Sequence, residues 1–248
     1  MLEGRRGHGL AVVEGELWAV GSKGEDTFPT SVFRSCERLD QVTNAWVRGP
    51  DMSTDRSNFG VATFNGELWV LGGLTSRTRL RSCERIDTVT GTWVPGPDMF
   101  VARVNHRVAV FDGELWAVGG HDRTSATCER LDTASNRWVP GPAMALACCC
   151  WFGLAVFRGQ LWAVAEFESL SSCEYLDVAT NSWIEGPRMT TPRQYLGLAV
   201  LNGCLWAVGG RTDSVFTSEF LDPITNTWVV AGPSLPAGVQ GLYVAVIP

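Results

Sequence analysis

Four cysteines recur at nearly even intervals along the chain, and each stands directly before a glutamate. They are Cys36, Cys83, Cys128 and Cys173. Cysteine thiolates bind zinc and form disulfides, so four of them could build a metal site or a covalent frame. The residues around them recur as well, as RSCERLDQVTNAWVRGPDM at 34–52 and RSCERIDTVTGTWVPGPDM at 81–99. The alternative is therefore a single structural position that occurs once in each copy of a repeat.

The repeat is marked most clearly by its tryptophans, because each unit of roughly 45 residues contains two of them. The first is Trp18, Trp69, Trp116, Trp162 or Trp206, and the second is Trp46, Trp93, Trp138, Trp183 or Trp228. Each unit also has four short apolar stretches bounded by turn residues. In the third unit, Asp112-Gly113 joins the stretches 108–111 and 114–118, and such a pair is a strong hairpin signal because both residues need positive φ. Four antiparallel strands per unit, five times over, predict the blades of a β-propeller.

Glycine pairs close the second strand in three of the units, at Gly72-Gly73, Gly119-Gly120 and Gly209-Gly210. Together with the tryptophan that follows in the fourth strand, this pattern resembles the kelch repeat over essentially the whole chain. The resemblance implies an all-β fold, a single propeller domain over 1–248. Its five four-stranded blades are expected at approximately 8–52, 59–99, 106–144, 152–189 and 196–235. Units one and four depart from the pattern, with Gly21-Ser22 and Ala165-Glu166, so we expect altered loops there.

The closure of the ring is left open by the two ends of the chain. Residues 9–13 already supply a first strand for the first blade, and 241–247 supply an extra C-terminal strand. The extra strand could displace residues 9–13 and close a five-bladed ring, which we favour because an unpaired apolar strand is an aggregation edge. Otherwise it begins a sixth blade of a longer protein.

The repeat also answers the question of the cysteines. Equivalent positions on packed neighbouring sheets lie on the order of 10 Å apart, whereas a disulfide needs Cα atoms within about 7 Å. Neither a disulfide nor zinc fits, so we interpret these cysteines as small core residues. Cys148-Cys149-Cys150, in the connection between the third and fourth blades, is interpreted as apolar packing, with a redox-sensitive or metal-binding cluster as the alternative.

Composition limits the classes of function. The net charge is −6 and the isoelectric point about 5.1, which argues against a general nucleic-acid binder. The N-terminal residues lack the apolar region of a secretory signal, and the longest uncharged apolar run, 144–157, is shorter than the ~18 residues of a membrane span. Eight cysteines without a signal predict reduced thiols in the cytoplasm or the nucleus.

Charge is divided between the two faces of the predicted propeller. We call the side formed by the loops after the second and fourth strands of each unit the loop face. Its basic residues are Arg5, Arg6, Lys23, Arg56, Arg77, Arg79, Arg81, Arg103, Arg123, Arg188, Arg193 and Arg211, with His106 and His121. The opposite side, formed by the turns after the first and third strands, is the turn face, and its charges are mostly acidic.

Arginine recurs on the loop face four residues before the first strand of four units, as Arg5, Arg56, Arg103 and Arg193, with Cys149 at that position in the fourth. Each arginine could pair with the recurring glutamate of the third strand (Glu37, Glu84, Glu129, Glu174, Glu219). Alternatively, the arginines bind a partner, because the resemblance implies that the loop face is a docking surface and arginine forks suit an acidic peptide. The candidate partner-binding residues are Arg56, Arg103, Arg193, Arg5, Arg77, Arg123, Arg211, His106, Trp151 and Tyr195.

No catalytic constellation is recognised in the sequence. The resemblance implies a scaffold or substrate-recognition propeller that binds a protein, with a cytoskeletal or ubiquitin-ligase component among the partners it permits. The alternatives are a kelch-like enzyme, either metal-dependent or sugar-processing, and an actin-associated propeller. A copper-radical site would need paired tyrosine and histidine, and Tyr175 falls on a third strand, away from the axis. His8 and His106 occupy the same repeat position near His121, but recurrence explains them without a metal, so we expect no cofactor.

Overall fold

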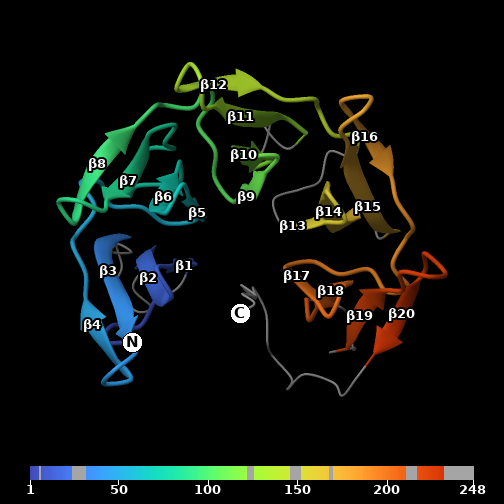
Figure 1. Ribbon diagram of the computed structural model, residues 1–248, viewed down its shortest axis with the longest axis horizontal. Helices are drawn as coiled ribbons and strands as arrows, with labels where there is room; N and C mark the ends of the chain where they lie inside the picture. The colour runs from blue at the N-terminus through green and yellow to red at the C-terminus, as the bar shows by residue number, and fades with distance from the viewer. Residues whose placement is uncertain are drawn as a thin grey trace. The chain divides into compact units, whose positions relative to one another are not determined.

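The regular structure of the protein is entirely β in the part of the chain described by the computed structural model. That part comprises residues 1–5, 7–23, 32–121, 126–145, 152–167, 170–210 and 217–231. It contains twenty strands and no helix (Figure 1). No segment in these ranges therefore has the helical length and apolarity that would span a membrane.

The strands form five four-stranded sheets, each built from four consecutive segments of the chain. The first sheet contains β1 (Gly9–Val13), β2 (Glu16–Lys23), β3 (Val32–Asp40) and β4 (Ala45–Arg48). The second contains β5 (Gly60–Phe64), β6 (Glu67–Leu71), β7 (Cys83–Asp87) and β8 (Thr92–Gly96). The third contains β9 (Arg107–Phe111), β10 (Glu114–Val118), β11 (Cys128–Asp132) and β12 (Arg137–Pro140).

The fourth sheet contains β13 (Gly153–Phe157), β14 (Gln160–Phe167), β15 (Leu170–Asp177) and β16 (Ser182–Glu185). The fifth contains β17 (Gly197–Leu201), β18 (Cys204–Val208), β19 (Ser218–Leu221) and β20 (Trp228–Ala231). Neighbours in sequence are neighbours in every sheet. This confirms the predicted all-β fold of five four-stranded propeller blades. The extra strand expected at 241–247 lies outside the described residues.

Two kinds of turn explain why the chain folds back so regularly. The first hairpin of each sheet turns on two residues with positive φ, such as Asn65 and Gly66 at 51° and 78°, the geometry of a type I′ turn. The second hairpin is closed by an aspartate. In the second sheet, Asp87 Oδ1 accepts hydrogen bonds from the backbone nitrogens of Val89 and Thr90 at 2.8 and 3.0 Å, and these bonds lower the pKa of its carboxyl group.

The glycine pairs decide where the second strand of a sheet ends. In the second sheet, β6 stops at Leu71, and Gly72 and Gly73 follow with φ of 58° and 97°. In the fourth sheet, where Ala165-Glu166 replaces the pair, the ladder between β14 and β15 continues to the Phe167–Leu170 rung. The first sheet also has a longer β2 and β3, with a register shift between Val20 and Ser22. The two repeats that depart from the glycine pattern, the first and the fourth, therefore have longer hairpins between their second and third strands.

The described contacts divide the chain into two compact units. Unit 1 comprises Met1–Val110, Glu114–Ala117 and Glu129–Val139, and unit 2 comprises Phe111–Gly113, Val118–Cys128 and Pro140–Pro248. In unit 1, Phe64, Trp69 and Met99 share an apolar core with Leu115 and Trp138. In unit 2, a corresponding core joins the fourth and fifth sheets, and Trp162, Met189 and Trp228 belong to it.

Neighbouring sheets within a unit are also joined by a recurring hydrogen bond. The indole nitrogen of the fourth-strand tryptophan donates to the carbonyl of the proline that follows the preceding sheet's last strand. In unit 1 these bonds run from Trp93 to Pro50 at 3.0 Å and from Trp138 to Pro97 at 2.9 Å. In unit 2 the bond from Trp228 to Pro187 is 2.9 Å long. The tryptophan and the Gly-Pro pair thus recur together because they form one contact between successive sheets.

We predict that Gly73→Ala is much more destabilising than Gly66→Ala, although both glycines have positive φ. Both substitutions carry the backbone cost of about 1–2 kcal/mol for a left-handed alanine. A Cβ at Gly73 would in addition lie 2.8 Å from the Ser57 carbonyl oxygen and 2.8 Å from Phe59 Cβ, whereas at Gly66 nothing lies within 4 Å. We expect a further loss of about 1–3 kcal/mol for Gly73→Ala from this crowding, measured by urea unfolding. Equal losses in the two variants would contradict the close contact of Gly73 with the connection that precedes β5.

Candidate functional site

The four arginines that recur before the first strand lie inside the protein. Arg5 is 8% exposed, Arg103 is 1%, and Arg56 and Arg193 are 0%. Each forms an ion pair with the glutamate of a third strand. The pairs are Arg5–Glu37 at 2.8 Å, Arg56–Glu84 and Arg103–Glu129 at 2.9 Å, and Arg193–Glu219 at 3.0 Å. Of the two interpretations left open by the sequence, the structure shows the ion pair with the strand glutamate.

All five N–H donors of Arg56 are used within the second sheet. Nη1 donates to the carbonyls of Gly72 and Ser82 at 2.9 and 2.7 Å, and Nη2 donates to Ser82 Oγ and Glu84 Oε1, both at 2.9 Å. Nε donates to Glu84 Oε1 at 3.2 Å. The placement of Arg5, Arg56, Arg103 and Arg193 on a docking surface is therefore corrected, because guanidinium groups that are buried and paired with a strand glutamate are not accessible to a partner.

The glutamate of each pair also binds the backbone of the connection that leads into its sheet. Glu84 Oε2 accepts from the Ser53 nitrogen and hydroxyl, both at 2.7 Å, and Oε1 accepts from the Thr54 nitrogen at 3.2 Å. Burial alone would raise the pKa of Glu84, but the bonds from Ser53 and the charge of Arg56 outweigh it and hold the pKa below its ordinary value. The ion pair thus fixes both the sheet and the connection that precedes it.

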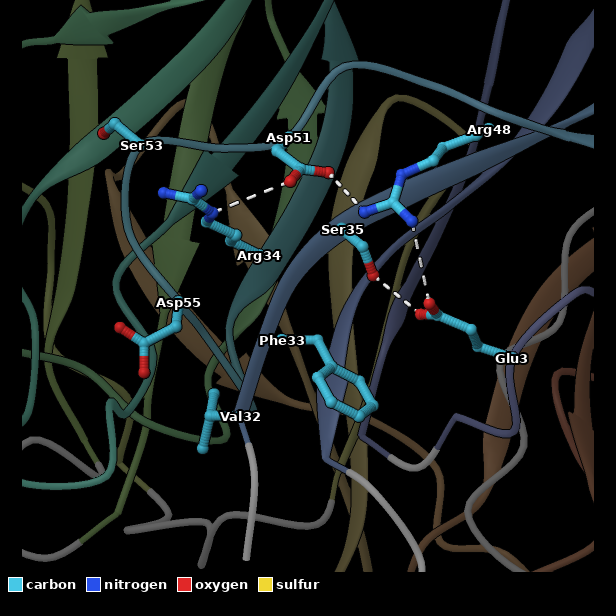
Figure 2. A pocket seen from close by; sticks show the side chains of 9 residues that line it. All are labelled: Glu3, Val32, Phe33, Arg34, Ser35, Arg48, Asp51, Ser53 and Asp55. Carbon is cyan, nitrogen blue, oxygen red and sulfur yellow. Dashed lines mark hydrogen bonds and ion pairs between the residues drawn. The ribbon is translucent and has the colours of Figure 1, made fainter.

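An open pocket of about 420 Å³ lies at the loop face of the first sheet (Figure 2). It is formed by the start of β3, the end of β4, the connection to β5 and the N-terminal residues. Its lining residues are Glu3, Val32, Phe33, Arg34, Ser35, Arg48, Asp51, Ser53 and Asp55. The pocket is therefore mostly polar and carries charges of both signs.

The ion pairs of this pocket are loose and exposed, in contrast to the buried ones. Asp51 lies between two arginines, 3.6 Å from Arg34 Nε and 3.3 Å from Arg48 Nη2, and Arg48 also reaches Glu3 at 3.9 Å (Figure 2). The side chains of Arg34 and Arg48 are 60% and 62% exposed. Pairs of this kind contribute about 0–1 kcal/mol, so another carboxylate could replace Asp51 at little cost.

The second sheet repeats part of this arrangement. Arg81 and Asp98 stand at the positions of Arg34 and Asp51 in the repeat, and their side chains pair at 3.3 Å while 60% and 47% exposed. None of these residues was among the partner contacts predicted from the sequence. The signal was present, because Arg34 and Arg81 both precede the repeat cysteine by two residues, whereas the buried arginines occur at another position. We call Arg34, Arg48 and Arg81, with Glu3, Asp51 and Asp98, the arginine surface.

The remaining predicted contact residues are scattered. Arg77 is exposed in the loop between β6 and β7, and Tyr195 is half-buried with a φ of 58°. His106 is buried and presents no surface, which corrects its place among the partner contacts. Arg123, Arg211 and Trp151 lie outside the described residues, as do Cys148, Cys149 and Cys150.

The repeat cysteines are interior thiols. Cys36, Cys83, Cys128 and Cys173 are buried. Burial raises the pKa of Cys36, Cys83 and Cys173 to about 12, so these thiols stay protonated at neutral pH. Within the described ranges, no group of three or more His, Cys, Asp or Glu side chains is arranged to hold a metal ion.

We predict that replacing Arg56 by methionine lowers the free energy of unfolding by about 3–5 kcal/mol, because Glu84 would keep a buried charge without its partner. As a matched control, Arg34→Met removes an arginine of an exposed pair and should cost at most about 1 kcal/mol. Thermal and urea unfolding of both variants would measure the difference. A small loss for Arg56→Met would show that the buried pair contributes little.

His106 makes the stability of the protein sensitive to acid. Among the residues that the structure describes, neither ring nitrogen of this buried histidine has a hydrogen-bond partner. Burial, and then the charges of Arg103 and Arg107, lower its pKa from 6.5 to about 3. The unfolded chain therefore binds the proton first, and stability is lost as the pH falls from 6.5 towards 3.

We predict that His106→Phe removes this loss of stability, because Phe59 and Phe152 occupy the position of His106 in two other repeats. The difference in unfolding free energy between variant and wild type should grow by about 1.4 kcal/mol per pH unit below pH 6.5. Urea unfolding at pH 7.5, 6.0 and 5.0 would measure it, in a range where the carboxylates keep their charge. A difference that does not change with pH would contradict the burial of a neutral imidazole.

Comparison with known proteins places this architecture in a family. The Kelch motif family matches residues 4–53, 55–100, 102–145 and 192–234, which is more than half of the chain. The fourth sheet falls between the matched ranges, and it is the sheet with Ala165-Glu166 in place of the glycine pair and Cys149 at the arginine position.

Individual relatives agree with the family match. Kelch-like protein 8 of Caenorhabditis elegans is 36% identical over 61 residues, which are 25% of this chain and 8% of that protein. The chain therefore aligns with a small part of the length of that relative. A solved structure titled "Structure of YjhT" has a TM-score of 0.77 with 14% sequence identity, over 92% of this chain and 84% of that chain, and this likeness shows the fold. The chain belongs to the family of kelch-repeat β-propellers.

Proposed function

We propose that this kelch propeller is a protein-binding module, either a scaffold or a substrate-recognition subunit, rather than an enzyme. We further propose that it binds an acidic segment of its partner at the arginine surface. The observation that carries the proposal is the contrast between two classes of arginine in unit 1. Arg56 is buried with every donor used, whereas Arg34, Arg48 and Arg81 are about 60% exposed in loose pairs.

The chemistry of the arginine surface suits a carboxylate-bearing segment. A guanidinium group offers a planar fork that matches a carboxylate in two parallel hydrogen bonds. In the pocket, Asp51 is shared between Arg34 and Arg48 at 3.6 and 3.3 Å. A partner carboxylate could therefore bind one arginine while Asp51 keeps the other. The second sheet offers a further arginine in the same repeat position, so an extended segment with several acidic residues would bind at both sheets.

We predict that Arg34→Glu/Arg48→Glu/Arg81→Glu abolishes capture of the partner. The variant reverses the charge at every arginine of the arginine surface and leaves the buried ion pairs unchanged. Arg137→Glu is the matched control, since Arg137 is an exposed arginine at the start of β12, on the turn face. The immobilised full chain would be exposed to cytosolic extract, since we propose a cytoplasmic or nuclear protein. Bound proteins would then be quantified by mass spectrometry.

Supporting partners are those that bind wild type and Arg137→Glu equally and fall at least about tenfold with the triple variant. Their capture should also weaken between 0.05 and 0.5 M salt, because screening reduces contacts between exposed charges. Circular dichroism and the thermal midpoint would establish that the triple variant is folded. A set of captured proteins that is the same for all three chains would overturn the arginine surface as the docking site.

A further inference from the structure

Two apolar residues stand exposed on the connection between β8 and β9 in unit 1. Phe100 is 62% exposed and Val101 is 39% exposed. Single exposed apolar side chains are common on protein surfaces. These two are adjacent, lie on the loop face, and include an aromatic ring of the kind that is enriched in interface contacts.

The backbone beneath them is held firmly. The Phe100 nitrogen donates to Glu129 Oε2 at 2.6 Å, and the Val101 nitrogen donates to Oε1 of the same carboxylate at 3.4 Å. Glu129 is 3% exposed and is paired with the buried Arg103 at 2.9 Å. The two side chains are thus displayed by a segment that is already ordered, so binding would cost little entropy for ordering this segment.

The fold does not require apolar residues at this position. The equivalent residues in the other repeats are Leu2, Ser53, Ala145 and Thr190, and all four are exposed. Ser53 and Thr54 make the same backbone bonds to Glu84 that Phe100 and Val101 make to Glu129. A polar pair therefore makes the same backbone bonds, which do not need a phenylalanine at this position.

An exchangeable arginine stands beside the apolar pair. The Met99 nitrogen donates to the Arg81 carbonyl at 2.9 Å, which joins the connection to the residue that carries the exposed guanidinium. The Arg81 side chain forms an ion pair with Asp98 at 3.3 Å, and both partners are exposed. The exposed apolar pair and the exposed arginine thus stand on two segments of the loop face that are hydrogen-bonded to each other.

We propose that Phe100, Val101 and Arg81 together bind a partner segment in which an aliphatic or aromatic residue stands beside an aspartate or glutamate. The apolar side chain of the segment packs on Phe100 and Val101, and its carboxylate displaces Asp98 from Arg81. This inference rests on the proposed function and adds to it the apolar residue that distinguishes the segment from any other acidic one.

The test uses the full chain and four sets of fluorescent twelve-residue peptides in a Gly-Ser background. One set contains Leu or Phe beside an Asp-Glu pair, the second has Ser in place of the apolar residue, the third has Lys in place of the acids, and the fourth has both changes. Fluorescence anisotropy would measure their affinities for wild type and for Phe100→Ser/Val101→Thr, which carries the residues of the second repeat. The control is Val89→Thr, which removes an exposed aliphatic side chain from the turn face of the same unit.

We expect the first set to bind wild type at least about tenfold more tightly than the other three, and Phe100→Ser/Val101→Thr to lose that preference. Val89→Thr should bind as wild type does. Should the double variant be unstable, Phe100→Thr, which copies Thr190, replaces it.

Two outcomes would overturn the inference while leaving the proposed function standing. One is that the peptides with the apolar residue and those with Ser in its place bind wild type equally, which would show that only the charge of the peptide determines its affinity. The other is that Phe100→Ser/Val101→Thr binds the first set as tightly as wild type does. Absence of binding by every peptide would also overturn it, whereas the proposed function is decided separately by capture from extract with the arginine variants.

Discussion

The buried pair of arginine and glutamate is the interaction on which the rest of the blade depends in four of the five repeats. Taking two charges out of water costs several kcal/mol per ion, and the attraction between them offsets this only when all remaining donors and acceptors are satisfied. Arg56 and Glu84 meet that condition through Gly72, Ser82 and Ser53. Because one carboxylate binds both the arginine and the preceding connection, the position of each connecting segment follows from the ion pair.

The hairpins and their number could be predicted from the sequence because their causes are local. An Asn-Gly or Asp-Gly pair dictates its turn through backbone conformation alone, and a glycine pair ends a ladder in the same way. The burial of a particular arginine is not a local property. Arg34 and Arg56 are both followed by a serine, and only the path of the connection places one beside Glu84 and the other in solvent. The sequence could therefore name the ion pair as one alternative, and the structure was needed to select it.

Side-chain pairs across strands vary together from sheet to sheet. In the first three sheets an arginine of the third strand pairs with a glutamate of the second, as in Arg85–Glu67, and the Arg85 guanidinium lies 6.0 Å from the Trp69 ring centre. In the fourth sheet Gln160 replaces the glutamate, and Tyr175 stacks on Trp162 with 4.9 Å between ring centres. Loss of the acid is accompanied by replacement of the arginine, because an aromatic ring covers the tryptophan without needing a counter-charge.

The ion pair constrains the backbone of the connections on the loop face, whereas the exposed side chains of these connections are free to differ between repeats. The glutamate binds the backbone nitrogens of the connection in every such pair, and the hydroxyls of Ser53 and Thr190 add a side-chain bond that Leu2 and Phe100 do not make. Leu2, Ser53 and Phe100 can therefore stand on equivalent supports with different chemistry. A recurring buried ion pair under a variable exposed residue allows one repeated architecture to present different contacts on different blades. Recognition by this protein is accordingly expected to reside in the differences between its repeats, and its stability in what they share.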